Sequence, residues 1–170
     1  MGILSGNPQE EPMHYGEVFS TWEFVMTANK DIADTLVLIN HVGDNDLKKL
    51  LQESVESGKA QVQQVSELLK ANGVALPPAA PEAPKAELND IPAGARFPDA
   101  DVAASASMAI AAALVACSQI MGQSIREDIA MMFGQIHVAK AALGAKYLKL
   151  TKEKGWLVPP PLHHYQLNDE

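Results

Sequence analysis

Two segments of this chain end in the same way: LLKANGVALPP at residues 68–78 and LTKEKGWLVPPP at residues 150–161. When they are aligned, a Leu, a Lys, a Gly and two Pro coincide at a constant offset of 82 residues. Glycine tolerates the left-handed backbone with which many helices end, and proline cannot continue a helix. Each segment therefore predicts the end of a helix followed by extended chain.

Upstream of each ending lies a long apolar pattern with the period of a helix, over residues 45–71 and 126–154. The two patterns align without a gap at the same offset, so that Leu47 matches Ile129 and Val65 matches Tyr147. We infer two copies of one helical hairpin, related in sequence or only in shape. The alternative is coincidence, because glycine followed by proline is a common helix ending.

Each hairpin needs a first helix, and residues 14–41 and 100–123 supply them. The first has an apolar stripe that Asn29 interrupts, and it ends at HVGDND, where Gly43 suits a left-handed ending and Asp44 an N-cap. The second is rich in Ala and Ser, so we expect it to pack closely on its neighbours and to be the most buried helix. Ser124 is the expected N-cap of the helix that follows.

Residues 74–99 contain six prolines, which forbid helix or central strand and predict an extended crossover. This crossover is long enough to run the length of a bundle. We therefore predict that residues 1–170 form one all-α domain, a ferritin-like four-helix bundle of two hairpins joined by a long proline-rich crossover, with an extended tail over 156–170.

The composition excludes several classes of function. A net charge of −8 argues against nucleic acid and anionic membranes as partners. The single Cys117 suits a reducing compartment, and the N-terminus shows no signal peptide, so we expect a cytoplasmic protein. The apolar stretch at 108–117 is too short to span a bilayer. No catalytic triad or phosphate loop is present, and we expect no enzymatic activity.

Ferritin-like bundles often hold metal through Glu-x-x-His motifs, and no complete motif lies on a predicted helix here. Glu56, His137 and His41 are the weak candidates for a partial metal site. The more ordinary role of His41 is to lie at a helix end, and that of His137 is to lie at the boundary of the apolar face of the fourth helix. Asn29 is expected to be a polar core residue with Gln61 as its partner. No cofactor is therefore expected, with a bound metal ion as the alternative.

Four stretches carry a resemblance to a known family: GEVFSTW, INHVGDNDLKKLLQESVE, LLKANGVALPP and EKGWLVPPP. Together they span most of the chain, which resembles one module of the spore coat protein F-like proteins of spore-forming bacteria, a ferritin-like family. The resemblance implies a structural role in the spore coat or in sporulation. Members of that family are expected to carry a histidine in the middle of the second helix. This chain departs from the family there, because it has Gln61 at that position.

Three functional hypotheses follow. The first is a non-enzymatic structural or assembly protein of the spore coat that acts through contacts with other coat proteins; the others are a degenerate ferritin-like metal-binding protein and a small-molecule binding module. We also expect a homodimer formed through the tail, with Trp156, Leu157 and Tyr165, or through the face beside the third helix. The alternative for the tail is that it packs along the bundle of its own chain and takes no part in association.

Overall fold

The computed structural model describes residues 11–163, which form four long helices and no strand. The helices are α1 (Tyr15–His41), α2 (Asn45–Ala71), α3 (Asp99–Gln123) and α4 (Glu127–Glu153), with two short 3-10 helices, η1 (Leu88–Asp90) and η2 (Ala93–Ala95), in the crossover. These bounds differ from the predicted ones by at most one residue.

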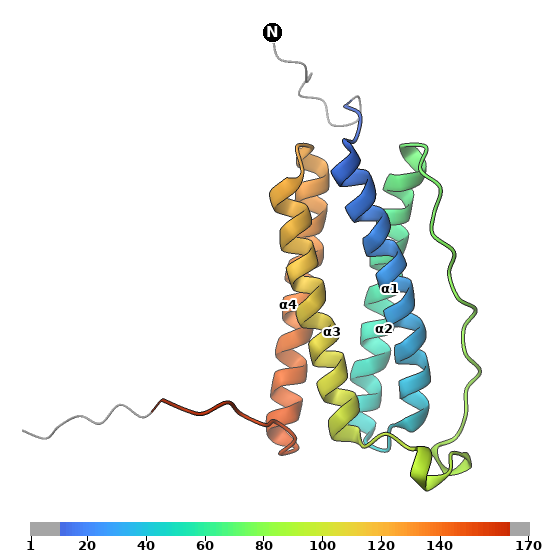
Figure 1. Cartoon of the computed structure of the whole chain (residues 1–170). Helices are drawn as coiled ribbons and strands as arrows, with labels where there is room; N and C mark the ends of the chain where they lie inside the picture. Colours follow the sequence, from blue (N-terminus) through green and yellow to red (C-terminus); the bar gives the residue numbers. More distant parts are fainter. Residues whose placement is uncertain (1–10, 164–170) are drawn as a thin grey trace, which may run out of the picture.

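The helices form an antiparallel bundle of two hairpins (Figure 1). The α1–α2 and α3–α4 hairpins are the most closely packed pairs, and the bundle closes through contacts of α1 with α3 and of α2 with α4. The crossover from α2 runs back along the outside of the bundle, so α2 and α3 are parallel. The all-α four-helix bundle with one long proline-rich crossover is therefore confirmed.

The core consists of two apolar clusters, one toward each end of the bundle. The cluster near the start of α1 contains Phe24, Val25, Ala28, Val65, Leu69, Cys117, Ile120, Ile129, Phe133 and Ile136. The cluster at the other end contains Val42, Leu47, Leu50, Leu51, Val102, Ala103, Ile110, Leu143, Tyr147 and Leu150. Between the two clusters lie the buried Gln61 and the half-buried Asp31 and Lys140.

The repeated ending of the sequence is a repeated backbone motif. Gly73 and Gly155 adopt φ values of 74° and 71°, the only positive values among the described residues. The N–H of Val74 donates to the carbonyl of Leu69 at 2.9 Å, and 82 residues later the N–H of Trp156 donates to the carbonyl of Thr151 at 2.8 Å. Both helices therefore end in the same Schellman motif.

The predicted ending of α1 was wrong in one respect. Val42 caps the helix in extended backbone, and Gly43 does not adopt a left-handed conformation. The carboxylate of Asp99 at the start of α3 accepts from the N–H groups of Gly43 and Asp44, each at 2.9 Å, which holds the loop without a left-handed residue. Asp44 is the N-cap of α2, as predicted, and accepts from the N–H groups of Asp46 and Leu47.

The turn between α3 and α4 also differs from the prediction. Ser124 does not cap α4; its hydroxyl donates back to the carbonyl of Ile120 at 2.7 Å. The acceptor at this turn comes from α1, where the fully buried Glu17 carboxylate accepts from the N–H groups of Ile125 at 2.8 Å and Arg126 at 3.0 Å. A distant carboxylate thus satisfies the donors that a local cap would have taken.

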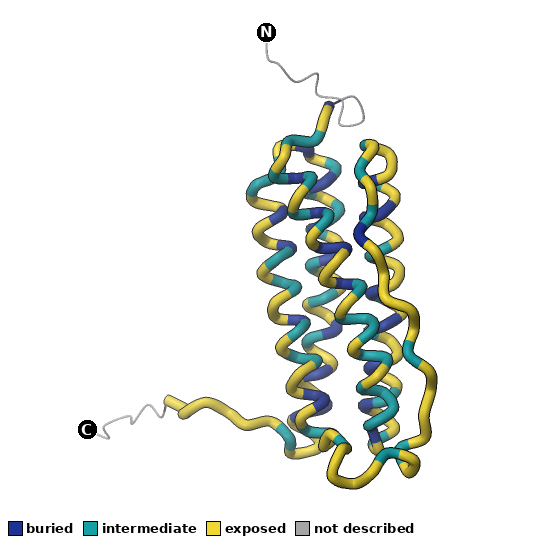
Figure 2. The backbone as a smooth tube through the Cα atoms, turned by 45° about the vertical axis from the view of Figure 1, so that its right-hand side comes forward, coloured by how far each residue is buried: buried dark blue, intermediate teal, exposed yellow. Residues whose placement is uncertain are grey.

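The prediction that α3 is the most buried helix was wrong (Figure 2). Its buried residues are Val102, Ala103, Ile110, Cys117 and Ile120, whereas Met108 and Val115 are 73% and 68% exposed. Each helix of a four-helix bundle turns only one side to its neighbours. Small side chains bring α3 close to the others but leave its outer side open.

The described part of the tail leaves the bundle (Figure 1). Trp156 is half-buried against the core cluster at that end, and residues 157–163 are exposed. The tail therefore does not pack along its own bundle over these residues. Tyr165, the third residue predicted for association, lies outside the described residues.

Candidate functional site

The outer surface of the α3–α4 hairpin carries almost no charge. No charged residue lies between Asp101 and Arg126, and Lys140 is the only one between Asp128 and Lys146. The exposed large hydrophobic residues of this hairpin are Met108, Val115, Met121, Ile125, Met131, Val138 and Leu148, whereas α2 exposes none. We call the exposed residues of α3 from Ala104 onward and of α4 from Met131 to Ala145 the uncharged face.

The hydropathy of α3 is also unusual for a helix with an exposed side. The segment from Ala93 to Gln123 is long and apolar enough to cross a membrane, judged by length and composition alone, with a mean hydropathy of 1.8 over its most apolar window. Only 22% of that window is buried in the bundle. A core helix of a soluble protein would bury most of it, so the face is a candidate for contact with another apolar surface.

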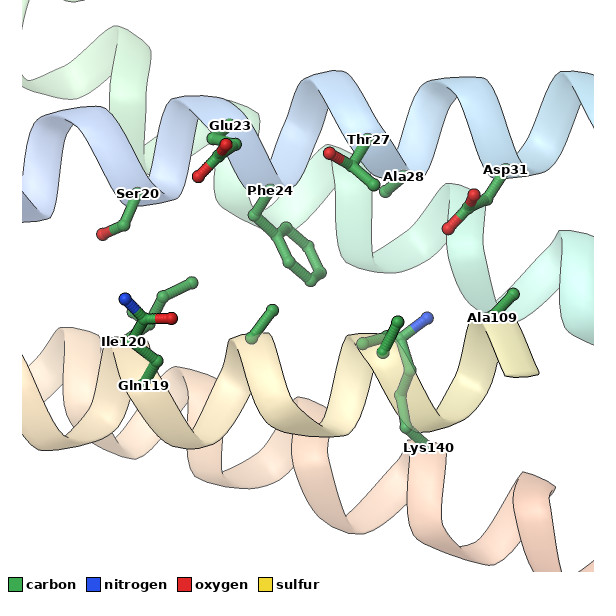
Figure 3. Close-up of a pocket in the computed structure, with 13 residues that line it drawn as sticks. Ser20, Glu23, Phe24, Thr27, Ala28, Asp31, Ala109, Gln119, Ile120 and Lys140 are labelled. Atoms are coloured by element: carbon green, nitrogen blue, oxygen red, sulfur yellow. The ribbon is translucent and has the colours of Figure 1, made fainter. Parts of the chain in front are cut away.

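A cavity of about 220 Å³ lies between α1 and α3, and we call it the inter-hairpin pocket (Figure 3). Four alanines of α3, at 109, 112, 113 and 116, form one wall. Phe24 and Ile120 line its apolar part, Ser20, Glu23, Thr27 and Gln119 line its polar part, and Asp31 and Lys140 lie together at one end. The pocket exists because alanine does not fill the gap between the two hairpins.

Lys140 and Asp31 are the ionisable groups of the pocket. Lys140 extends from α4 between the helices, with its nitrogen toward the side where Asp31 lies (Figure 3). Burial lowers the pKa of Lys140 and raises the pKa of Asp31, while each charge partly offsets the effect on the other. Within residues 11–163 neither side chain makes a hydrogen bond or an ion pair closer than 4 Å, so both keep unused capacity toward the pocket.

A smaller cavity of about 60 Å³ continues from this end of the pocket and shares Asp31 and Lys140 with it. It reaches Tyr147, whose hydroxyl forms a hydrogen bond of 2.9 Å with Ser54. Burial raises the pKa of Tyr147 to about 12. The middle of the bundle is thus polar and incompletely filled.

The predicted pair of polar core residues does not form. Gln61 is buried, but its amide donates to Ser57 at 3.0 Å, and its Oε1 is the one buried side-chain nitrogen or oxygen of the described residues without a hydrogen-bond partner. Asn29 is half-buried at an outer pocket beneath the crossover, beside Ala79 and Glu82. The side of α1 that carries Asn29 is therefore turned toward the crossover and not toward the centre of the bundle.

The weak metal candidates are not gathered at one place. His41 lies at the end of α1, where its Nδ1 accepts from the N–H of Phe97 at 3.4 Å and its ring contacts the Phe97 ring. Glu56 is exposed on α2 and His137 is half-buried on α4. Among residues 11–163 no three side chains of His, Cys, Asp or Glu form a group that could hold a metal ion.

Sequence reasoning missed the buried polar residues that matter most here. Lys140 stands alone in an uncharged stretch, four residues after Ile136 and three before Leu143, which is the spacing of an inward position. Glu17 stands at similar spacings before Thr21 and Phe24. These spacings could have marked both side chains as inward. As expected, Cys117 is buried, and burial raises the pKa of its thiol.

Comparisons with known proteins agree over nearly the whole chain. Residues 1–168 match the family described as "Protein of unknown function (DUF3231)". The uncharacterized protein YvdQ of Bacillus subtilis is 69% identical over 163 residues, which cover 96% of each chain.

Solved structures extend this likeness. A crystal structure from Bacillus halodurans C-125, named a "putative spore coat protein", is 56% identical and superposes with a TM-score of 0.92, covering 94% of this chain and all of that one. A conserved hypothetical protein of Mycobacterium tuberculosis, 12% identical with a TM-score of 0.63 over 81% of this chain and 98% of its own, shares the fold alone. With the family match spanning both hairpins, the chain belongs to the DUF3231 family of proteins of unknown function.

Proposed function

We propose that this protein is a non-enzymatic structural or assembly component of the spore coat that acts through protein contacts. The 56% identical protein of Bacillus halodurans is named for the spore coat, and the sequence resembles the spore coat protein F-like family. A coat protein needs surfaces that persist in contact with other proteins rather than a reaction centre.

The uncharged face is the observation that carries this proposal. Isolated hydrophobic residues are ordinary on a protein surface, but an uncharged surface along two adjacent helices is not. The chain carries a net charge of −8, so two copies repel each other through most of their surfaces. The uncharged face is where that repulsion is weakest, and a second copy of this chain is therefore the occupant that we propose.

The dimensions of the face suit a homodimer. The face covers α3 from Ala104 to Gln123, a length of roughly 30 Å at 1.5 Å per residue. Two adjacent helices about 10 Å across give a surface of roughly 600 Å² on each copy. This lies at the lower end of the roughly 600–1,000 Å² per partner that a stable interface of standard size buries. The face can thus form a two-fold symmetric contact, and further coat proteins would bind to other surfaces.

A metal-binding function is less well supported, because the described residues lack a cluster of ligands. Insertion of α3 into a membrane is also less well supported. Its inner side packs on α1 and α4, and its removal would expose Ile110, Cys117 and Ile120 together with the core residues that they cover.

Light scattering and vesicle flotation test the contact. We expect the wild-type protein to have twice the 18.2 kDa mass of one chain at micromolar concentration. Val115→Glu with Val138→Glu should give a folded monomer, whereas Ala60→Glu with Gln64→Glu, which adds the same two negative charges on the exposed side of α2, should remain a dimer. Truncation after Gly155 tests the tail. A monomeric wild-type protein at high micromolar concentration, or one that floats with neutral vesicles, would contradict the proposed homodimer.

Localisation tests the coat assignment itself. A fluorescent fusion should surround the forespore in sporulating Bacillus subtilis that lacks YvdQ, and it should be extracted with the coat proteins. A fusion that remains dispersed in the mother cell throughout sporulation would refute the assignment. The two assays are separate, because a dimer that stays dispersed would leave the uncharged face explained and the spore coat excluded.

A further inference from the structure

We propose that the inter-hairpin pocket binds a single-chain amphiphile with a neutral hydroxyl head, the chemistry of a medium-chain alcohol or a monoacylglycerol. This inference does not depend on the coat assignment, because the pocket lies between α1 and α3 within one chain.

The shape of the pocket favours a chain over a compact molecule. It extends along α1 from Ser20 to Asp31, eleven residues, or roughly 16 Å at 1.5 Å per residue. Its volume of about 220 Å³ exceeds the roughly 150 Å³ of an engineered apolar cavity that binds benzene. A long, narrow space of this volume suits an alkyl chain of about eight carbons.

The wall chemistry places the alkyl part. Phe24 and Ile120 meet the alanine wall of α3, and water in contact with these apolar groups gains little hydrogen bonding. Other inward positions of α3 are packed: Ala103 and Ile110 are buried in one apolar cluster and Cys117 in the other. The gap is therefore centred on the four alanine positions, and the smaller cavity continues from it toward Ala106.

Asp31 and Lys140, which lie together at one end of the pocket, place the head group and define its chemistry. The Lys140 ammonium only donates hydrogen bonds and the Asp31 carboxylate only accepts them. A hydroxyl group can accept from the first and donate to the second at once. The two charges cancel, so a carboxylate or ammonium head would leave a net charge in a poorly solvated place.

Titration calorimetry with 1-octanol tests the proposal, and octanoate and octylamine serve as charged analogues for comparison. We expect saturable binding of one 1-octanol molecule per chain, with the two charged analogues bound at least about tenfold more weakly. Chemical-shift changes in an NMR titration should be confined to residues around Ala113 and Lys140. Binding that does not saturate, or a charged analogue bound as tightly as octanol, would overturn the proposal.

Substitutions on one helix separate pocket binding from general adsorption. Ala113→Leu should fill the pocket and weaken binding at least about tenfold, whereas Ala111→Leu, exposed on the same helix and outside the pocket, should leave it unchanged. Ala112→Leu at the exposed rim replaces the first variant if that one fails to fold. Lys140→Met should weaken octanol binding and remove the discrimination against octylamine. Equal binding by the 111 and 113 variants would show that octanol binds elsewhere.

Discussion

The Glu17 carboxylate holds the two hairpins together at one end of the bundle, and its removal should destabilise the protein more than any exposed acid does. Its Oε1 accepts from the N–H groups of Ile125 and Arg126, and its Oε2 accepts from the N–H of His14 at 3.1 Å. The side chain is fully buried. Glu17→Ala leaves these donors without their acceptor.

The magnitude follows from the kinds of bonds that are lost. A hydrogen bond to a charged group contributes about 1.5–3 kcal/mol, and two of them join α1 to the α3–α4 turn. The third closes the capping box of α1 and contributes at the lower end of the 0.5–2 kcal/mol range of a cap. Ile125 is half exposed, so water can replace part of the loss. We expect Glu17→Ala to cost about 3 kcal/mol and Glu17→Gln about 1–2 kcal/mol.

Urea denaturation measures this cost. With a dependence of about 1–3 kcal/mol per molar urea, the midpoint of Glu17→Ala should fall by roughly 1–3 M, and the melting temperature by roughly 6–12 °C. Glu23→Ala, exposed on the same helix, is the control and should stay within about 0.5 kcal/mol of wild type. The reasoning is refuted if the two alanine variants unfold at the same urea concentration.

Three further predictions concern the helix ends and the buried ionisable groups. Gly155→Ala should cost about 1 kcal/mol because of its left-handed backbone, whereas Gly94→Ala, in open space at an ordinary backbone angle, should be neutral in the same melting experiment. The raised pKa of Tyr147 contributes stability that is present below pH 10 and is lost as the pH rises to about 12. Over this range the free energy of unfolding of the wild-type protein should fall by up to about 2–3 kcal/mol more than that of Tyr147→Phe. The hydrogen bond from Arg126 lowers the pKa of Asp128, so Asp128→Asn should destabilise at pH 7, and its difference from wild type should vanish as the pH falls well below 4 in acid titrations followed by circular dichroism.

The error about α3 shows how sequence composition can mislead. A run of alanine and apolar residues without charge predicts burial if the helix is surrounded by others. In a bundle of four, α3 contacts mainly α1 and α4, and Met108 and Val115 remain on its open side. The same composition thus produced both features that we propose are functional: the uncharged face on the outer side and the alanine wall of the pocket on the side toward α1.

What the sequence determined by itself was the set of helices, the endings of α2 and α4, and the crossover. These depend on contiguous residues: the period of the apolar stripe, the glycine at 73 and at 155, and the prolines between 77 and 98 act within a turn or two of where they stand. What only the tertiary structure decided was where polar side chains find their partners. Glu17 meets the N–H of Ile125, 108 residues away, and Lys140 shares a pocket with Asp31 of another helix. Such pairings depend on which faces the folded helices turn to one another, and no local pattern encodes the distance between two helices.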